Sequence, residues 1–352
     1  MIALFMAGGS GKRLWPLSRE DNPKQLHALI GKKSLMTQTI ERVAPLIEPK
    51  DIWIVTSRKY VKQIAKHSPG VPQRQILSEP FALGTNLAVG LGAIHIARQE
   101  PEAVILVGWA DSHIGREVEF RAALEKANQI VHEVDGIILG IKPTYPATSY
   151  GYIQIGNTIV GTEDIFEISR FEEKPDAKRA EEIFQSARHL WNPGISVWKV
   201  SRLLELIKEF TPDHFAALEY VAEAIGKEDE TGRMEEAFRG LETVAIDRSI
   251  FEKASNLATI PVDLDWNDIG AWSAIYEVQA QNGGNVTRGS VVTLDTEKCL
   301  IYANKRLIAT LGVSDLVIVE TEDAILIAHK NETDRLKELH AQVISLGGVQ
   351  YL

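Results

Sequence analysis

The chain has 352 residues, of which 45% are hydrophobic and 24% are charged, and its formal net charge is −10. This is the composition of a globular protein with ample core material, and its acidity argues against a nucleic-acid binder, which is usually basic. The single cysteine, Cys299, excludes an intrachain disulfide. We expect a cytoplasmic protein that does not enter a membrane, because no apolar run reaches the length of a span and the N-terminal apolar run lacks the basic region of a signal peptide.

The first stretch with chemical character is a glycine-rich loop that follows the apolar run Ile2–Ala7. The loop reads Gly8-Gly9-Ser10-Gly11-Lys12-Arg13, and Lys24 closes the segment after it. Glycines allow close backbone approach, and successive N–H groups form an anion-binding hollow. The dinucleotide fingerprint fails at Leu14, and a P-loop would need Ser or Thr in place of Arg13. With two cations added, the pattern favours a polyphosphate site over a tight turn without a ligand.

Up to about residue 142, short branched apolar segments alternate with helical patterns, which predicts a parallel sheet covered on both faces. Such a sheet binds ligands beyond the carboxyl ends of its strands, where the glycine loop lies. The expected strands are 52–56, 76–78, 104–108 and 137–141, and the expected helices are 35–47, 61–66, 88–98 and 118–131.

The alternation becomes irregular from about 143 to 284, and we expect this part to build the second half of the pocket. Its expected elements are strands at 152–155, 165–171 and 195–200, and helices at 177–187 and 202–210, the latter with Ser201 as N-cap. From 285 the predicted strands are 291–294, 299–303, 307–311, 316–319 and 324–328, followed by a helix over 333–344. We therefore predict an α/β fold: a Rossmann-like, mostly parallel catalytic domain over 1–284 and a short β-helix-like module over 285–352 with a closing helix. The module could serve oligomerisation or packing only.

The glycine loop resembles the signature of sugar-1-phosphate nucleotidyltransferases. The continuation Leu14-Trp15-Pro16-Leu17-Ser18 and the segment Pro23-Lys24-Gln25-Leu26 resemble the mannose-1-phosphate guanylyltransferases of that family. The resemblance implies that Arg13 and Lys24 are catalytic and hold the triphosphate. It implies a nucleotide site made of Ala7, Gly8, Gly9, Ser10, Gly11, Arg13, Lys24, Glu79, Thr85 and Asp111.

Two acidic motifs extend the resemblance. Asp111 follows the apolar segment 103–107, where it could hold a metal, cap a helix or be solvated. It falls on the family's Pro-Ala-Asp-His-x-Ile motif, with the histidine displaced to His113. Asp268, in Trp266-Asn267-Asp268-Ile269-Gly270, could be a simple turn residue but matches the family's second acidic motif. The resemblance implies that Asp111 and Asp268 are catalytic and bind Mg²⁺, with Mn²⁺ or Co²⁺ as substitutes.

For the sugar phosphate, strand alternation places Glu172 and Lys174 on one face, as either a binding pair or a surface pair. The family's Phe-x-Glu-Lys-Pro motif implies that Lys174 meets the sugar phosphate, and the segments around Gly151 and Asn192 resemble its sugar pocket. The resemblance also places Glu79 near the guanine. The chain departs from the family pattern at 83–87, 108–113, 149, 193 and 248–249.

We therefore expect an enzyme that transfers a guanylyl group from GTP to mannose 1-phosphate by in-line attack on the α-phosphate, with release of pyrophosphate. The expected assembly is a homodimer, and because the chain ends at Leu352 we expect no isomerase domain. A near alternative is a transferase for another hexose 1-phosphate or another NTP. A more distant alternative is a non-catalytic, nucleotide-sensing subunit.

Overall fold

The computed structural model describes residues 1–9 and 11–352, which form two compact units assembled from separate stretches of the chain. One, here called the sheet unit, comprises Met1–Gly8, Ile40–Ala110 and Ile114–Trp266. The other, here called the loop unit, comprises Gly9–Thr39, Asp111–His113 and Asn267–Leu352. The glycine loop therefore leaves the sheet unit after Gly8 and continues in the same unit as the C-terminal strands.

A ten-stranded mixed sheet forms the centre of the sheet unit, in the order β11-β8-β7-β9-β6-β10-β4-β1-β2-β3. Strands β3, β2, β1 and β4 are mutually parallel. Strand β1 is apolar and fully buried, without alternation, as expected for a parallel strand covered on both faces. The strands are β1 (Ile2–Met6), β2 (Ile52–Ser57), β3 (Ile76–Glu79), β4 (Val104–Trp109), β6 (Gly136–Ile141), β7 (Gly151–Thr158), β8 (Phe166–Glu173), β9 (His189–Asn192), β10 (Ser196–Lys199) and β11 (Leu257–Val262).

Beyond β4 the sheet becomes largely antiparallel: β10 pairs with β4 and β6, and β7 pairs with β8 and β9. Strand β11 returns parallel to β6 and also pairs with β8. The sheet is therefore mixed, and its antiparallel half corresponds to the irregular part of the sequence. Two short strands, β5 (His113–Ile114) and β12 (Trp266–Asn267), lie where the chain passes from one unit to the other.

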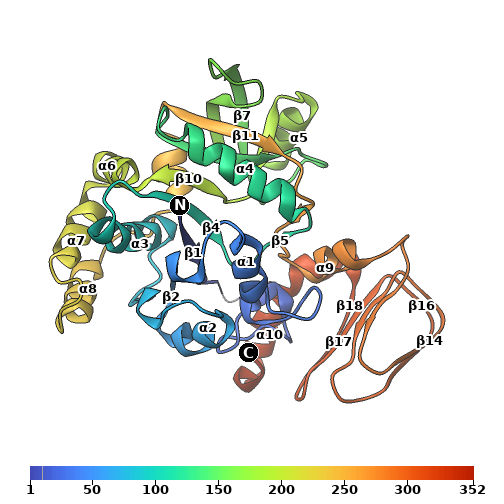
Figure 1. Ribbon diagram of the computed structural model, residues 1–352. Coiled ribbons are helices and arrows are strands. Elements are labelled where there is room, and N and C mark those ends of the chain that lie inside the picture. Colours follow the sequence, from blue (N-terminus) through green and yellow to red (C-terminus); the bar gives the residue numbers. More distant parts are fainter. Residues whose placement is uncertain (10) are drawn as a thin grey trace. The chain divides into compact units, whose positions relative to one another are not determined.

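Helices cover the sheet, and those of one group pack closely on one another. Helix α3 contacts β1 and β2, and it also packs against α6 and α7, with α8 beyond α7 (Figure 1). Their shared core includes Leu4, Leu91, Leu206 and Leu218. The helices are α1 (Leu35–Val43), α2 (Val61–His67), α3 (Thr85–Gln99), α4 (Glu117–Ile130), α5 (Ala177–Gln185), α6 (Val200–Phe210), α7 (Pro212–Ala222) and α8 (Glu230–Phe238).

The C-terminal strands of the loop unit form two small sheets in the manner of a short β-helix. Strands β13, β15 and β17 are parallel, with β18 antiparallel at their edge, and β14 runs parallel to β16 (Figure 1). Cys299, Ile301 and Ile318 pack between them. The elements are α9 (Trp272–Gln279), β13 (Val286–Arg288), β14 (Val291–Glu297), β15 (Leu300–Tyr302), β16 (Ile308–Ser314), β17 (Leu316–Glu320), β18 (Ile325–His329) and α10 (Leu336–Ser345). We call residues 285–352 the β-module.

Some expected boundaries are wrong. Helix α6 begins at Val200 and its N-cap is Lys199, so Ser201 is not the N-cap. Helix α1 ends at Val43, and the closing helix α10 is preceded by a 3₁₀ segment, Lys330–Arg335. Among the residues that the structure describes, no helix combines the length and the apolarity needed to cross a bilayer.

Candidate functional site

The glycine loop is anchored where it leaves the sheet. The Ala7 N–H donates to the carbonyl of Val55 (2.8 Å), and the Thr56 hydroxyl donates to the Ala7 carbonyl (2.8 Å). Gly8 and Gly9 are exposed, and a Cβ at either would have no atom within 4 Å, so this backbone lies open to a ligand. Ser10 lies outside the described residues.

Gly11 is required by its own conformation and by a neighbour. Its φ is +69°, and a Cβ there would stand 2.6 Å from the Cβ of Lys24. The backbone of the loop therefore packs directly on the residue that the sequence predicts as its second cation, and a side chain at position 11 would push Lys24 aside.

Lys24 brings together three of the four residues predicted to be catalytic. Its side chain is 8% exposed, and its Nζ lies 3.0 Å from Asp111 Oδ2. The same Nζ donates to the backbone carbonyl of Asp268 at 2.7 Å. Arg13, the fourth, is partly exposed, and its Nη1 lies 3.7 Å from the carboxylate of Asp334. All four belong to the loop unit, although they come from three separate stretches of sequence.

The two predicted metal carboxylates suit a hard cation. Asp111 is partly exposed, and Asp268 uses Oδ1 to accept the Gly270 N–H (3.0 Å). The described residues contain no cluster of three or more His, Cys, Asp or Glu side chains arranged to hold a metal. Mg²⁺ commonly takes one or two protein carboxylates and completes its shell with water and phosphate oxygens. The donor set therefore fits a metal that arrives with the nucleotide.

Glu79 ends strand β3 in the sheet unit, where the sequence predicts a contact with the base. Burial raises its pKa to about 7. Its Oε1 is buried without a hydrogen-bond partner among the described residues. A buried carboxylate oxygen without a donor costs free energy, so a ligand N–H at this point would be stabilising.

Thr85 begins helix α3, and its hydroxyl accepts the N–H of Ile246 (2.8 Å). Gly84, with a φ of +88°, lies so close to Val244 that a Cβ would stand 2.3 Å from its carbonyl oxygen. The segment that departs from the family pattern at 83–87 is thus folded against the stretch that precedes residue 247. Thr85, predicted to bind nucleotide, holds this stretch.

A buried polar network continues from this contact. Asn86 is fully buried, and its Oδ1 accepts from Ser249 Oγ (2.9 Å). Its Nδ2 lies 3.0 Å from His214 Nδ1 and 3.1 Å from Thr211 Oγ1. The two departures from the family pattern, at 83–87 and at 248–249, therefore contact one another. Sequence reasoning missed this network, whose only signal is polar residues at positions where the helical pattern expects apolar ones.

The predicted sugar-phosphate residues lie at the ends of neighbouring antiparallel strands. Gly151 pairs with Glu173 on β8 and with Asn192 on β9. A Cβ on Gly151 would stand 2.5 Å from Glu173 Oε2, so the glycine leaves room for that carboxylate. Lys174 Nζ lies 2.5 Å from Glu173 Oε1. The structure therefore brings Gly151, Asn192 and Lys174 into one region of the sheet unit, around Glu173.

Glu172 is not part of this group, so the expected sharing of a face with Lys174 is wrong. Its carboxylate accepts from Arg179 Nε and Nη2, each at 3.1 Å, and lies 3.5 Å from Arg170. Strand alternation fails here because β8 ends at Glu173 and Lys174 turns to a φ of +50°. The carboxylate beside the lysine is therefore that of Glu173.

Asp247 also belongs to this region, although the sequence analysis assigned it no role. It begins a π-helix, Asp247–Phe251, a rare element that is frequent at functional sites. Its Oδ1 accepts from Asn192 Nδ2 (2.8 Å). Burial, and next the negative charge of Glu173, raise the pKa of Asp247 to about 6.

Comparisons with known proteins bear on the fold and the family of the chain. A family model described as nucleotidyl transferase matches residues 2–285, and one described as MannoseP isomerase/GMP-like beta-helix domain matches residues 289–343. These matches confirm the predicted α/β class with its β-helix-like module.

Similar proteins include the alginate biosynthesis protein AlgA of Pseudomonas putida, 34% identical over 96% of this chain and 70% of its own length. The mannose-1-phosphate guanylyltransferase of Escherichia coli K12 is 34% identical over 97% of this chain and 73% of its own. A crystal structure from Thermus thermophilus, described as a mannose-1-phosphate geranyltransferase, is 33% identical with a TM-score of 0.88, over 97% and 98% of the two chains.

Proposed function

Because the chain belongs to the nucleotidyl transferase family, with mannose-1-phosphate guanylyltransferases among its relatives, we propose that it makes GDP-mannose and pyrophosphate from GTP and mannose 1-phosphate. The observation that supports this most directly is Lys24, which packs against Gly11 of the glycine loop and contacts both Asp111 and Asp268. The obstacle in such a transfer is repulsion between anions, so positioning and charge neutralisation carry the catalysis.

We assign the triphosphate to the glycine loop. The backbone N–H groups of Gly8, Gly9 and Gly11 would donate to the phosphates, while Ala7, whose N–H is bonded to Val55, would anchor the loop. Arg13 and Lys24 would neutralise the phosphates and the leaving pyrophosphate. Glu79 would accept from the N–H groups of guanine, which would satisfy its buried Oε1. Thr85 would act indirectly, because its hydroxyl already holds Ile246.

We assign the mannose 1-phosphate to the group around Gly151. Lys174 would bind the phosphate, while Glu173 and Asn192 would accept from and donate to the sugar hydroxyls. Glu173 thus has the role expected of Glu172, whose carboxylate is bonded to Arg179 instead. Asp247 would orient the Asn192 amide through its hydrogen bond.

Asp111 and Asp268 would hold the divalent cation, for which we propose Mg²⁺ with Mn²⁺ or Co²⁺ as substitutes. Bound there, the cation would supply charge neutralisation at the α-phosphate. The residues of the chain would then act by holding the attacking phosphate oxygen and the α-phosphate in line, and no side-chain nucleophile is needed.

We also propose a homodimer that uses the β-module. Leu294 on β14 and Leu311 on β16 are directly paired, and both are more than 60% exposed. Together with Val292, two residues before Leu294 on β14, they give this small sheet an exposed apolar surface of the kind that marks protein interfaces.

The function is tested by pyrophosphate release from each of four NTPs with a panel of hexose 1-phosphates. The expected result is release with GTP and mannose 1-phosphate above all other pairs, its loss on chelation with EDTA and its return with excess Mg²⁺. Preference for another pair would assign the same chemistry to another nucleotide sugar. Nucleotide binding without turnover under any pair would favour the non-catalytic sensing role.

A further inference from the structure

The segment that joins Arg13 to Lys24 is attached to the β-module. Within the loop unit, the Trp15 indole N–H donates to the carbonyl of Tyr351 (2.6 Å), and the Trp272 indole N–H donates to the carbonyl of Trp15 (3.0 Å). The first bond joins this segment to the last helical turn of the β-module, and the second joins it to the start of α9. Residues proposed to hold the triphosphate are thus supported by C-terminal residues that no step of the chemistry uses.

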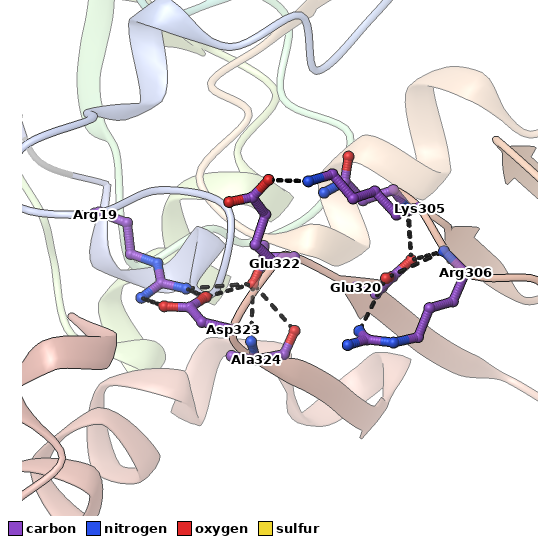
Figure 2. A network of polar contacts seen from close by, with 9 residues as sticks. Arg19, Lys305, Arg306, Glu320, Glu322, Asp323 and Ala324 are labelled. Atoms are coloured by element: carbon purple, nitrogen blue, oxygen red, sulfur yellow. Dashed lines mark hydrogen bonds and ion pairs between the residues drawn. The ribbon is translucent and has the colours of Figure 1, made fainter.

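The most specific of these attachments is made by Arg19. Its Nη2 lies 2.7 Å from Asp323 Oδ1 and its Nη1 lies 3.3 Å from Oδ2, a two-pronged contact (Figure 2). Its Nε donates to the carbonyl of Pro16 (2.6 Å), and Nη2 also reaches the Thr321 hydroxyl (3.3 Å). The guanidinium carbon lies 6.0 Å from the centre of the Trp15 ring, and the side chain is only 12% exposed. Such a planar, multiply bonded arginine fixes direction as well as distance.

Asp323, which accepts from Arg19, is also held by hydrogen bonds within its own turn. Thr321 Oγ1 lies 3.0 Å from Asp323 Oδ1, and the Thr321 N–H donates to the carbonyl of Ala324 (2.9 Å) in the turn between β17 and β18. Burial opposes ionisation of Asp323, but the bonds from Thr321 and Arg19 outweigh it and lower its pKa. Glu320, the residue before Thr321, is buried and accepts the backbone N–H groups of residues 304–306 (Figure 2).

Arg19 also lies at the midpoint of the segment it would control. The Arg19 N–H and carbonyl exchange hydrogen bonds with Asn22 (3.0 and 3.2 Å), closing a turn directly before Pro23 and Lys24. On the other side, the N–H groups of Leu17 and Ser18 both donate to the carbonyl of Leu14, which follows Arg13. A displacement of Arg19 would thus be carried by short hydrogen-bonded turns to both cations.

Apolar packing also ties this segment to the β-module, because Leu14 and Trp15 lie in one core cluster with Val317 and Leu326. Beside this packing, residues of both the segment and the module line an open cleft of about 540 Å³. The cleft is lined on one side by Pro16, Leu17, Asp21, Asn22, His27 and Ala28, and on the other by residues of the strands and turns between Arg288 and Asp323. Arg19 and Asp323 both line this cleft, so their ion pair adds a directional contact there to the apolar packing of Leu14 and Trp15.

We propose that the Arg19–Asp323 pair, here called the module latch, positions the segment from Arg13 to Lys24 and thereby sets the affinity for the nucleotide triphosphate. The β-module is then part of the nucleotide-binding apparatus, and Arg19 and Asp323 are positioning residues. This rests on the proposed function only in taking the glycine loop as the triphosphate site.

The test compares Arg19→Ala, Asp323→Asn and the double variant with the wild type, by kcat and KM for GTP and for mannose 1-phosphate at fixed ionic strength and Mg²⁺. The matched control is a second ion pair of the same β-module, Lys305 with Glu322 (Figure 2), removed by Lys305→Ala and Glu322→Gln. Asp323→Asn keeps the shape of a half-exposed side chain, so it remains informative where Arg19→Ala folds poorly.

We expect each latch variant to raise KM for GTP about five- to tenfold, as for loss of one charge-assisted contact, with KM for mannose 1-phosphate within twofold. KM for GTP in the double variant should not exceed that of the more strongly affected single variant, because both substitutions remove the same contact. The control variants should match the wild type. Equal effects on both substrates, additive single effects, or an unchanged KM for GTP in a folded Asp323→Asn would overturn the latch. Failure of the proposed function would show separately, as wild-type protein that releases no pyrophosphate.

Discussion

At the scale of single residues, the two lysines proposed to meet phosphates differ in their surroundings. Lys24 is almost fully buried and holds two groups of its own unit, Asp111 and the carbonyl of Asp268. Lys174 is more than half exposed and contacts Glu173. A buried ammonium with two hydrogen-bonding partners is a fixed charge, whereas an exposed one can follow a mobile ligand.

We predict that the matched variants Lys24→Met and Lys174→Met separate the substrates. Lys174→Met should raise KM for mannose 1-phosphate by about one to two decades and change KM for GTP much less, because one charge-assisted contact is lost. Lys24→Met should impair GTP use or kcat instead. Steady-state kinetics at fixed ionic strength measures both, since salt screens exposed charges. If both variants affected both substrates equally, the assignment of two phosphate sites would fail.

The raised pKa of Glu79 gives a second prediction at this scale. Because its pKa of about 7 exceeds the reference value of 4.5, the folded protein keeps a proton that the unfolded chain loses between these values. Stability conferred by this residue therefore falls from about pH 4.5 to 7 and stays low above. We expect Glu79→Gln to raise the free energy of unfolding at pH 8 by roughly 1–3 kcal/mol, with little difference at pH 4.

Urea unfolding at the two pH values measures this difference. The same variant tests the role of the carboxylate in binding, because only its ionised form accepts two guanine N–H groups. In the wild type, kcat/KM for GTP should rise as the pH passes about 7, and this rise should be absent in Glu79→Gln. If Glu79→Gln showed the same dependence of kcat/KM on pH as the wild type, Glu79 would not be the residue that binds the base.

At the scale of elements, the first turn of α3 and the π-helix Asp247–Phe251 are joined by the Asn86 network. Both polar atoms of the Asn86 side chain have partners from other elements: Ser249 from the π-helix, and Thr211 and His214 at the start of α7. Networks of this kind specify one arrangement because leaving them half satisfied is costly.

We predict that Asn86→Ala lowers the free energy of unfolding by about 2–4 kcal/mol, since it strands several buried partners at once. Ser249→Ala should cost less, because Asn86 keeps its other contacts. An exposed asparagine of β7, Asn157, is the control, and Asn157→Ala should change stability by no more than about 0.5 kcal/mol. Denaturant unfolding with unchanged m-values is the measurement, and an Asn86→Ala as stable as Asn157→Ala would contradict the network's role.

At the scale of the whole molecule, the proposed homodimer can be tested through the apolar pair on the β-module. Leu294→Lys and Leu311→Lys should each shift the mass from dimer to monomer in light scattering, because a charge would be buried in the interface. Val160→Lys, at a residue 94% exposed in the sheet unit, is the control and should leave the mass unchanged. A monomeric wild type, or variants that keep the dimer mass, would remove this surface from the assembly.

The parts that the sequence predicts well are those governed by local pattern. Buried runs such as Ile52–Ser57 and the short strands of the β-module appear close to their expected places, because apolar periodicity and turn residues determine them locally. The glycine loop was found from its glycines and cations alone.

What the sequence could not supply depends on contacts between distant residues. Strand alternation favours Glu172 over Glu173 as the partner of Lys174, because it does not reveal that Lys174 leaves the strand with a positive φ. The pairing of Asn86 with Ser249 joins residues 163 positions apart. Nor does any local pattern indicate that residues 9–39 pack in one unit with residues 267–352.

That last arrangement has a consequence for synthesis on the ribosome. Lys24 donates to the carbonyl of Asp268, 244 positions later, and Trp15 donates to the carbonyl of Tyr351, 336 positions later. A nascent chain can begin to fold its parallel strands early, but the loop made first must wait for partners made last. Chains released before residues 267–352 would then carry an unsupported glycine loop, so the ability to use nucleotide would report that translation had run through the whole β-module.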